Sequence, residues 1–433
     1  MMRKVQVSVE AVAFKGYGVA RIDGKIAFVP YTLTGDEVWI EITEEKKTYS
    51  AGRLIQLLKP SPGRVNSPCT YFGTCGGCQW QHIDYSTQVE LKKEILGETV
   101  KRLGGMKEIP SISVVPSPKP YDYRIRVQLK VKGKTMGYYQ ERSHRIVDVK
   151  HCPISHPLVN QIIRRLREDL DALSRIEEVE INVSPEEGRG VLLFHPYSHH
   201  PPTEHFITDL LHGQPTLKGI AVTEKDGIHV TGDPVLNFTI PLSREREKRE
   251  LKLRISAGSF SQVNPEQNQR LVQTVLQFSE GNQKDRVLDL YAGAGNLTLS
   301  LATEAGEILG IEENRVAFQD GQSNAERNAV KNCRFIHGRV EEVLSDWKRG
   351  SPDLIVLDPP RTGCKTILDR VVRLKPKKIV YVSCEPTTFA RDLRLFSERG
   401  YSLQKLSLID MFPQTYHMET VGLLKPDERV QGV

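Results

Sequence analysis

Apolar and polar residues alternate along most of the first 56 positions of the chain. Runs such as VQVSVEAVAF and EVWIEITEE are broken by glycines, among them Gly16 and Gly35. Alternation with a period of two, interrupted by glycine, is typical of the short strands of a small β-barrel. The sequence Lys-Pro-Ser-Pro-Gly at 59–63 then indicates a linker. We therefore predict a small β-barrel domain over residues 1–59.

The pattern changes twice further along the chain. Residues 86–103 repeat apolar positions at helical spacing behind a Ser/Thr cap, which predicts a helix, and residues 121–255 are mostly strand-like. From residue 256 onward, the apolar runs RVLDL, EILGI, DLIVL and KKIVYVS alternate with helical segments, as in a parallel doubly wound sheet. The predicted fold class is therefore α/β, with a Rossmann-like domain over 256–433 behind a strand-rich central domain over 60–255.

Composition narrows the class of protein. The chain has 60 Lys and Arg against 54 Asp and Glu, and this net charge of +6 fits an anionic partner without requiring one. No apolar run approaches the ~20 residues that span a bilayer, and the N-terminal residues lack a signal-peptide pattern. We expect a cytoplasmic protein with no membrane partner. Its seven cysteines are an odd number, which favours metal binding or catalysis over a disulfide framework.

A glycine-rich turn indicates a nucleotide-like ligand. The strand VLDL runs into YAGAGN, so that a ligand can approach the backbone between a strand and a helix. The turn lacks the third glycine of the dinucleotide pattern, and Asp289 suits the amino group and sulfonium of S-adenosylmethionine better than a pyrophosphate. Glu312 ends the next strand, where a carboxylate can accept both ribose hydroxyls. The alternative is that these glycines form only a tight turn.

Two strand ends offer groups for chemistry on a pyrimidine. Carbon 5 of uracil becomes nucleophilic when a thiolate adds to carbon 6, and a base must then remove the carbon-5 proton. Cys384 ends the buried run KIVYVSC, and Asp358, a candidate for orienting the substrate, follows the run LIVL. Cys384 could instead be a buried small apolar residue, and Cys364 is a rival nucleophile.

Several motifs together resemble the 5-methyluridine RNA methyltransferase family, which includes the transfer-RNA T-loop enzyme and the 23S ribosomal-RNA enzymes. The motifs are FSQVNPEQN (260–268), LDLYAGAGN (288–296), LDPPRTG (357–363), YVSCEPTTFARDL (381–393), HMETVGLL (417–424) and CTYFGTCGGCQWQ (69–81). The resemblance implies that Cys384 is the nucleophile and that Glu419 removes the proton. It implies that S-adenosylmethionine is the methyl donor, contacted by Gln262, Tyr291, Asn296, Glu312 and Asp358.

Two of these assignments depend on the family alone, and one position departs from it. Without the resemblance, Glu419 would be interpreted as an exposed strand carboxylate and Gln262 as a polar loop residue. Where many relatives place an acidic or amide residue near the adenine amine, this chain has His337-Gly338-Arg339. Recognition of adenine at this position therefore stays open.

The cysteine-rich segment suggests an inorganic centre. Cys69, Cys75 and Cys78 lie close together, and Cys152 could supply a fourth thiolate. Four thiolates suit an iron-sulfur cluster or tetrahedral zinc, and spacing alone does not choose between them. The longer ribosomal-RNA enzymes hold a [4Fe-4S] cluster with this pattern, so the resemblance favours that cluster. Aromatic side chains between residues 71 and 82 would form its apolar shell or stack on a base.

The resemblance also suggests the partner. The N-terminal barrel resembles the TRAM module, a small RNA-binding fold, and with the iron-sulfur insert it points to 23S ribosomal RNA methylated by a monomeric enzyme. Methylation of uridine 54 of transfer RNA is the alternative within the family.

Two readings fall outside the family. An amino-directed nucleic-acid or protein methyltransferase could use Asp358-Pro359-Pro360 as a substrate loop, but this leaves Cys384 and Glu419 without a role. A non-catalytic RNA-binding protein with a degenerate methyltransferase fold is the other, and the intact motifs argue against it.

Overall fold

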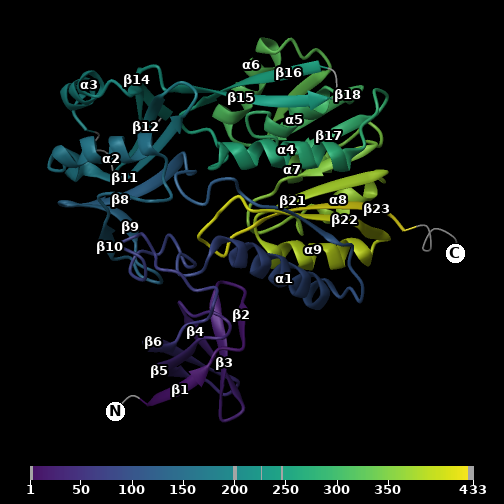
Figure 1. The fold of residues 1–433 in the computed structure, drawn as a ribbon. Coiled ribbons are helices and arrows are strands. Elements are labelled where there is room, and N and C mark those ends of the chain that lie inside the picture. Colours follow the sequence, from purple (N-terminus) through teal and green to yellow (C-terminus); the bar gives the residue numbers. More distant parts are fainter. Residues whose placement is uncertain (1–2, 198–201, 226, 245–246, 428–433) are drawn as a thin grey trace.

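The computed structural model describes residues 3–197, 202–225, 227–244 and 247–427. In this part of the chain, the strands form sheets of six, seven, two and eight strands (Figure 1). None of the helices described there combines the length and the apolar character that a membrane span requires.

The N-terminal segment is all β, as its alternating pattern predicts. Its strands run in the order β1-β5-β6-β4-β3-β2, and β1 also approaches β3, so that the sheet curls around its own core. Val7, Val29, Val38 and Ile40 fill that core. The strands are β1 (Lys4–Ser8), β2 (Ala11–Ala13), β3 (Tyr17–Ile22), β4 (Lys25–Pro30), β5 (Glu37–Glu45) and β6 (Tyr49–Lys59).

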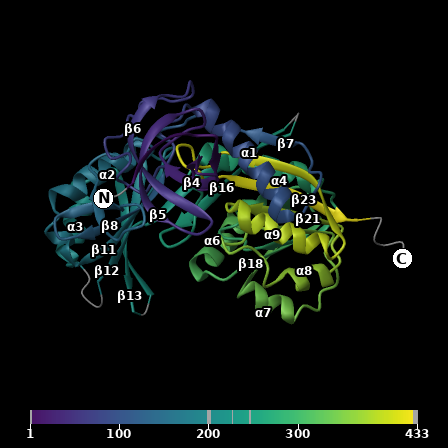
Figure 2. The same ribbon diagram turned by 90° about the horizontal axis from the view of Figure 1, so that it is seen from below.

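The predicted helix over 86–103 is confirmed as α1 (Tyr85–Gly104). Its cap is Asp84, whose side chain accepts a hydrogen bond from the Thr87 amide, and not the Ser/Thr expected from the sequence. The helix packs on α9, and the strand after it, β7 (Ile112–Val115), pairs with β22 of the eight-stranded sheet (Figure 2). Both elements lie within the predicted central domain of 60–255; α1 buries Leu91, Leu96 and Val100, and β7, whose residues are at most partly buried, extends the C-terminal sheet.

The central sheet has seven strands in the order β10-β9-β8-β11-β12-β13-β14. Residues 121–255 were expected to be mostly strand, and the structure adds two helices that cover this sheet, α2 and α3. The elements are β8 (Arg126–Lys132), β9 (Thr135–Tyr139), β10 (Ile146–Asp148), α2 (Pro157–Glu168), η1 (Ala172–Arg175), β11 (Ile176–Ser184), β12 (Arg189–Pro196), α3 (Glu204–Gly213), β13 (Leu217–Glu224) and β14 (Gly227–Gly232). The hairpin of β15 (Val235–Arg244) and β16 (Glu247–Ser256) packs on α6 and leads into α4.

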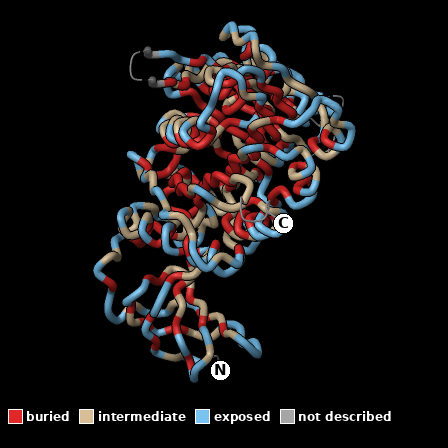
Figure 3. The backbone as a smooth tube through the Cα atoms, turned by 90° about the vertical axis from the view of Figure 1, so that its right-hand side faces the viewer, coloured by how far each residue is buried: buried red, intermediate tan, exposed pale blue. Residues whose placement is uncertain are grey.

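The C-terminal sheet has the order β19-β18-β17-β20-β21-β23-β22-β7, and its first five strands are parallel. Buried residues gather along its strands, whereas the N-terminal barrel mixes buried, intermediate and exposed positions (Figure 3). The doubly wound sheet predicted from residue 256 onward is confirmed. Its elements are α4 (Pro265–Ser279), β17 (Arg286–Leu290), α5 (Asn296–Ala302), β18 (Glu307–Glu312), α6 (Arg315–Arg327), β19 (Cys333–His337), α7 (Val340–Ser345), β20 (Leu354–Leu357), α8 (Leu368–Arg373), β21 (Lys378–Ser383), α9 (Pro386–Ser397), β22 (Tyr401–Ile409) and β23 (Glu419–Pro426).

Candidate active site

The carboxyl edge of the parallel strands gathers the groups singled out from the sequence. Asp358 and Cys384 follow the neighbouring strands β20 and β21. β23 runs antiparallel to β21, and Ser383 pairs with Thr420, so Glu419 begins its strand at the same edge. A strand that reverses direction thus brings a C-terminal carboxylate to the nucleophile candidate.

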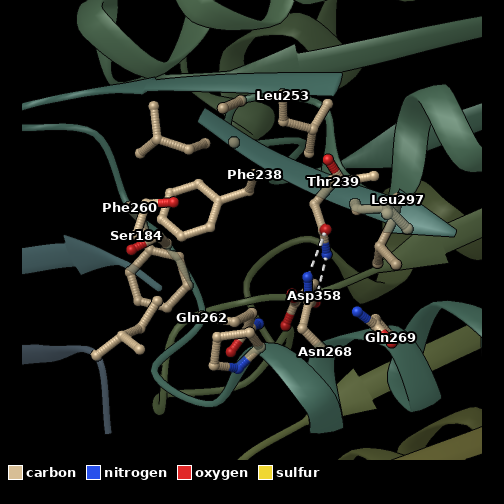
Figure 4. A pocket seen from close by; sticks show the side chains of 18 of the residues that line it. Ser184, Phe238, Thr239, Leu253, Phe260, Gln262, Asn268, Gln269, Leu297 and Asp358 are labelled. Carbon is tan, nitrogen blue, oxygen red and sulfur yellow. Dashed lines mark hydrogen bonds between the residues drawn. The ribbon is translucent and has the colours of Figure 1, made fainter. Parts of the chain in front are cut away.

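A cavity of about 190 Å³ opens beside this edge. Phe238 and Phe260 lie on one side of it, across from Asp358 and Asn268 (Figure 4). Four of the five predicted donor contacts line the cavity: Gln262, Tyr291, Asn296 and Asp358. Asn296 and Asn268 exchange side-chain hydrogen bonds of 2.9 Å, which fixes α5 against α4 beside the cavity.

The turn after β17 has the strained backbone that close approach of a ligand requires. Tyr291, Gly293 and Gly295 have positive φ values of 69°, 56° and 92°. A Cβ placed on Gly295 would lie 3.1 Å from the ring of Phe335, so a larger residue would push the turn out of place. The backbone of this turn and the packing of Gly295 therefore both favour glycine.

Glu312, the fifth predicted donor contact, is not among the residues that line the cavity. Its carboxylate accepts hydrogen bonds from the backbone N–H groups of Gly293, at 2.8 Å, and Asn314, at 2.7 Å. It thus holds the glycine-rich turn from beneath. Arg339, at the departure from the family, begins α7 and also lies outside the cavity lining.

Asp289 presents an unpaired carboxylate oxygen in a buried place. Its Oδ2 accepts a 2.5 Å hydrogen bond from the Thr298 hydroxyl, and its Oδ1 has no partner. Burial raises the pKa of Asp289 to about 7, and burial also raises the pKa of Asp358 to about 7. A cation in the cavity would restore the charge of both groups, which suits an ammonium or a sulfonium.

The nucleophile candidate faces two charged groups of opposite sign. Burial and, to a smaller extent, the charge of Glu419 raise the pKa of the Cys384 thiol to about 12, against the opposing effect of Arg361. Burial and Asp358 raise the pKa of Glu419 well above its usual range, and Arg361 again opposes them. Glu419 is only 3% exposed, so it is not the exposed strand carboxylate that the sequence alone suggested.

Arg361 is the charged group that sequence reasoning did not single out. The signal was present, because an arginine directly after Asp-Pro-Pro must lie at the same sheet edge as the aspartate. The loop that carries it is fixed by Asp392, which accepts hydrogen bonds of 2.8 Å from the Cys364 amide and from the Tyr381 hydroxyl. Cys364, the rival nucleophile, is fully buried beneath this loop, and burial raises the pKa of its thiol well above the usual range.

The four cysteines predicted to bind a metal line one cavity of about 110 Å³, although Cys152 lies far from the others in sequence. Burial raises the pKa of Cys69 and Cys75, the latter to about 11. Among the described residues, no three His, Cys, Asp or Glu side chains are grouped as ligands of a single metal ion. Of the neighbouring aromatic residues, Tyr71 and Phe72 line the cavity, and Trp80 is fully buried.

Comparison with known proteins completes the description of the site. Residues 84–427 match the family model of tRNA (uracil-5-)-methyltransferases, and residues 2–55 match the TRAM domain. A 23S rRNA (uracil(1939)-C(5))-methyltransferase, RlmD of Pectobacterium atrosepticum, is 34% identical over 98% of this chain and 94% of its own length. An uncharacterized RNA methyltransferase of Aquifex aeolicus is 35% identical over 98% of this chain and 99% of its own.

A solved structure has the same overall arrangement. The tRNA (uracil-54, C5)-methyltransferase of Pyrococcus abyssi, in complex with S-adenosyl-L-homocysteine, superposes with a TM-score of 0.75 at 25% identity. The match covers 97% of this chain and 100% of that one.

Proposed function

This chain belongs to the tRNA (uracil-5-)-methyltransferase family, and from that membership we infer how its own residues carry the reaction. It is an S-adenosylmethionine-dependent RNA uracil-C5 methyltransferase with an N-terminal TRAM domain. One observation supports the detailed mechanism best: Cys384 and Glu419 lie at facing ends of β21 and β23, beside the cavity that Asp289 and Asp358 share.

We propose that Cys384 attacks carbon 6 of the uracil as a thiolate. The new C–S bond places electron density on carbon 5, which then bonds to the methyl group while the bond from that group to the donor's sulfur breaks and S-adenosylhomocysteine is left. Bound S-adenosylmethionine supplies that methyl group as an electrophile. Glu419 then takes the proton from carbon 5, the C–S bond breaks, and the thiolate of Cys384 leaves. All atoms balance without an oxidant or a reductant.

Charges around Cys384 support its role. A buried thiol ionises reluctantly, and Arg361 lowers the pKa of Cys384 against burial and against Glu419. Cys384 also directly precedes Glu385, the N-cap of the 12-residue helix α9, where the helix dipole favours a negative charge. The raised pKa of Glu419 makes it a stronger proton acceptor than an exposed carboxylate.

We propose the residues that contact the methyl donor from their positions around the cavity. Asp289 offers its unpaired oxygen to the amino group, and Gln262, Tyr291, Asn296 and Asp358 line the cavity around the donor. Glu312 can accept from the donor's ribose hydroxyls with its remaining lone pairs, since each of its oxygens accepts only one backbone hydrogen bond, from Gly293 or from Asn314.

Substitution of the two cysteines tests the mechanism. Cys384→Ala should abolish methylation and leave S-adenosylhomocysteine binding intact, because only the thiolate is removed. Cys364→Ala is the matched control and should stay active. Wild-type enzyme should form a covalent adduct with RNA containing 5-fluorouridine, visible on a denaturing gel, since fluorine cannot leave as a proton. An active Cys384→Ala enzyme would overturn the assignment.

We further propose 23S ribosomal RNA as the substrate. The RlmD relative is more similar over nearly the full length than the archaeal tRNA enzyme of known structure, and that archaeal likeness keeps uridine 54 of tRNA as the second candidate. Mapping 5-methyluridine in RNA from a deletion strain decides between them. Loss in 23S rRNA alone supports the proposal, and loss in tRNA alone replaces it.

We also propose that Cys69, Cys75, Cys78 and Cys152 hold a [4Fe-4S] cluster. Four thiols from distant segments line one space, the arrangement that a core larger than a single ion needs. Tetrahedral zinc is the alternative with the same ligands. The cytoplasmic location and the monomeric state stay predictions.

A further inference from the structure

A second hollow, of about 580 Å³, lies where four parts of the chain meet. The end of the central sheet that carries β9 and β10 faces the N-terminal barrel there (Figure 1). The cysteine-rich segment and the connection from β22 to β23 complete the wall through Gly77 and Tyr416. The residues that line the hollow include Lys15, Tyr17, Tyr139, Arg142, His144 and Tyr416.

Hydrogen bonds tie the walls of this hollow together. The hydroxyl of Tyr17 donates to Glu141 at 2.7 Å, and that of Tyr31 donates to the other oxygen of the same carboxylate at 3.1 Å. Arg142 donates to the Tyr17 hydroxyl at 2.7 Å. The barrel is thus fastened to the central sheet, and the hollow has defined walls.

The hollow lies near the candidate active site, because Tyr416 in its lining is close enough to Arg361 and Glu385 for their charges to act on its hydroxyl. Tyr416 lines it and packs against His417, with ring centroids 4.2 Å apart, and Glu419 follows two residues later. On the barrel side, Tyr416 meets Phe14 edge to face at 5.7 Å. An RNA strand that places one nucleotide at Cys384 would therefore pass this hollow with a neighbouring one.

The lining has the two kinds of group that hold an unpaired nucleotide. Tyr139, His144 and Tyr416 offer aromatic rings, on which bases stack without sequence preference, and the guanidinium of Arg142 lies over the ring of Tyr17 at 5.2 Å. Lys15 and Arg142 are cations that can neutralise a phosphate, and only Glu141 opposes them in charge. We propose that this hollow binds an unpaired nucleotide that flanks the target uridine, an inference that rests on the proposed function.

The cysteine cavity and the hollow share part of their walls. Gly77 and Tyr138 line both, and the amide of Gly76 donates to the carbonyl of Tyr139 at 2.9 Å. Whatever the four cysteines hold therefore supports the floor on which the nucleotide lies.

Direct binding tests the hollow independently of catalysis. The probe is a fluorescein-labelled, uridine-containing single-stranded RNA, titrated with the full-length, anaerobically purified protein and S-adenosylhomocysteine, and read by anisotropy. Tyr139→Leu and Arg142→Ala should each weaken binding about tenfold. Tyr139→Phe should bind like wild type, because the ring remains. Arg21→Ala, an exposed barrel arginine paired with Glu10, is the control for Arg142.

Other outcomes separate the two proposals. Wild-type affinity of both variants for the single strand overturns the nucleotide site, whatever the methylation activity. Equal competition by the same sequence as a duplex also overturns it, since a paired base cannot stack in the hollow. Weakened binding in a protein that methylates no uridine would keep the site and reject the proposed function. Unchanged hydrogen exchange across residues 60–155 excludes local misfolding of the variants.

Discussion

At the scale of single residues, the site gathers carboxyl groups whose burial opposes ionisation. Asp289, Asp358 and Glu419 all have raised pKa values, with burial as the main cause. Their carboxylates would repel one another if all were charged in an empty cavity. Ligand cations and Arg361 relieve that repulsion, which links the charge state of the site to what it binds.

Donor affinity should therefore depend on pH. Asp289 and Asp358 have pKa values of about 7, so both are increasingly protonated below that pH and cannot attract the donor's ammonium group. Affinity for S-adenosylhomocysteine should rise from about pH 6 to about pH 8 and then level off. Calorimetric titration across this range measures it. Asp289→Asn should bind more weakly with a smaller pH dependence, whereas Asp369→Asn, at a surface pair, should match wild type. A flat wild-type profile would contradict the prediction.

Removal of the proton acceptor should stall the reaction after methyl transfer. In Glu419→Gln the amide cannot accept the carbon-5 proton, so the C–S bond to Cys384 cannot break. Turnover should fall by about a hundredfold or more, and a methylated protein–RNA complex should accumulate on denaturing gels. Glu398→Gln, at the C-cap of α9 in an exposed pair with Arg394, serves as the control. Normal turnover of Glu419→Gln would remove this residue from the mechanism.

The sequence predicted which residues lie at strand ends, but it did not show which charged groups their side chains face. Cys384 and Asp358 were predicted at the sheet edge because a buried run ends at each of them, and the structure places both there. Glu419 could not be placed from pattern alone, because its position depends on an antiparallel strand that returns beside β21. Arg361 was missed because its place in a sequence motif does not show which groups its side chain faces.

At the scale of elements, α1 supports the connection that carries Glu419. Lys92 of α1 and Asp410 at the end of β22 form a fully buried ion pair of 2.6 Å. Lys92 also donates to the carbonyl of Phe412 at 3.1 Å, and Tyr85 donates to Asp410 at 2.8 Å. The start of the β22–β23 connection is thus held by a helix from the other end of the chain.

Breaking this pair should cost much more than breaking a surface pair. Lys92→Ala leaves the charge of Asp410 buried without its main partner, so unfolding free energy should fall by about 3–5 kcal/mol. Arg394→Ala, which breaks the exposed pair with Glu398, should cost at most about 1 kcal/mol. Denaturant titrations measure both. The double variant Lys92→Met/Asp410→Leu should recover stability. Equal losses of unfolding free energy in Lys92→Ala and Arg394→Ala would contradict the prediction.

The sequence predicts helices and strands better than it predicts which of them pack together. Helix α1 was found from its apolar spacing, yet its place against α9 was not, because the two lie at opposite ends of the chain. The same holds for β7, whose parallel pairing with β22 no local pattern encodes. Which elements pack together therefore depends on contacts between distant parts of the chain, which a local pattern does not encode.

At the scale of the whole molecule, the barrel, the central sheet and the C-terminal sheet meet near the reacting edge. Phe14 of the barrel contacts Tyr416, and Gly16 packs so closely on the ring of Trp80 that a side chain there would clash. The segment with the cysteines lies at this junction. We expect its loss to disturb RNA binding more than donor binding, because the donor cavity is built by other residues.

Replacing one cysteine should test this expectation and the nature of the centre. Anaerobically purified wild type should be brown, absorb broadly near ~400 nm, and contain iron and sulfide. Cys78→Ser should lose iron and destabilise residues 60–155, because the binding energy of the cluster is also folding energy for that segment. Proteolysis and hydrogen exchange should report the loosening there. Cys333→Ser, at the far edge of the C-terminal sheet, is the control that keeps its iron.

Donor binding by Cys78→Ser shows how far the loss of the cluster disturbs the structure. Cys78 lines the cysteine cavity and not the donor cavity, so Cys78→Ser should still bind S-adenosylhomocysteine while its affinity for single-stranded RNA falls. Loss of donor binding as well would mean that the cluster supports the whole fold. A colourless wild-type protein with about one zinc per chain would instead refute the iron-sulfur proposal, and the four thiolates would then form a structural zinc site, because tetrahedral zinc takes the same ligands.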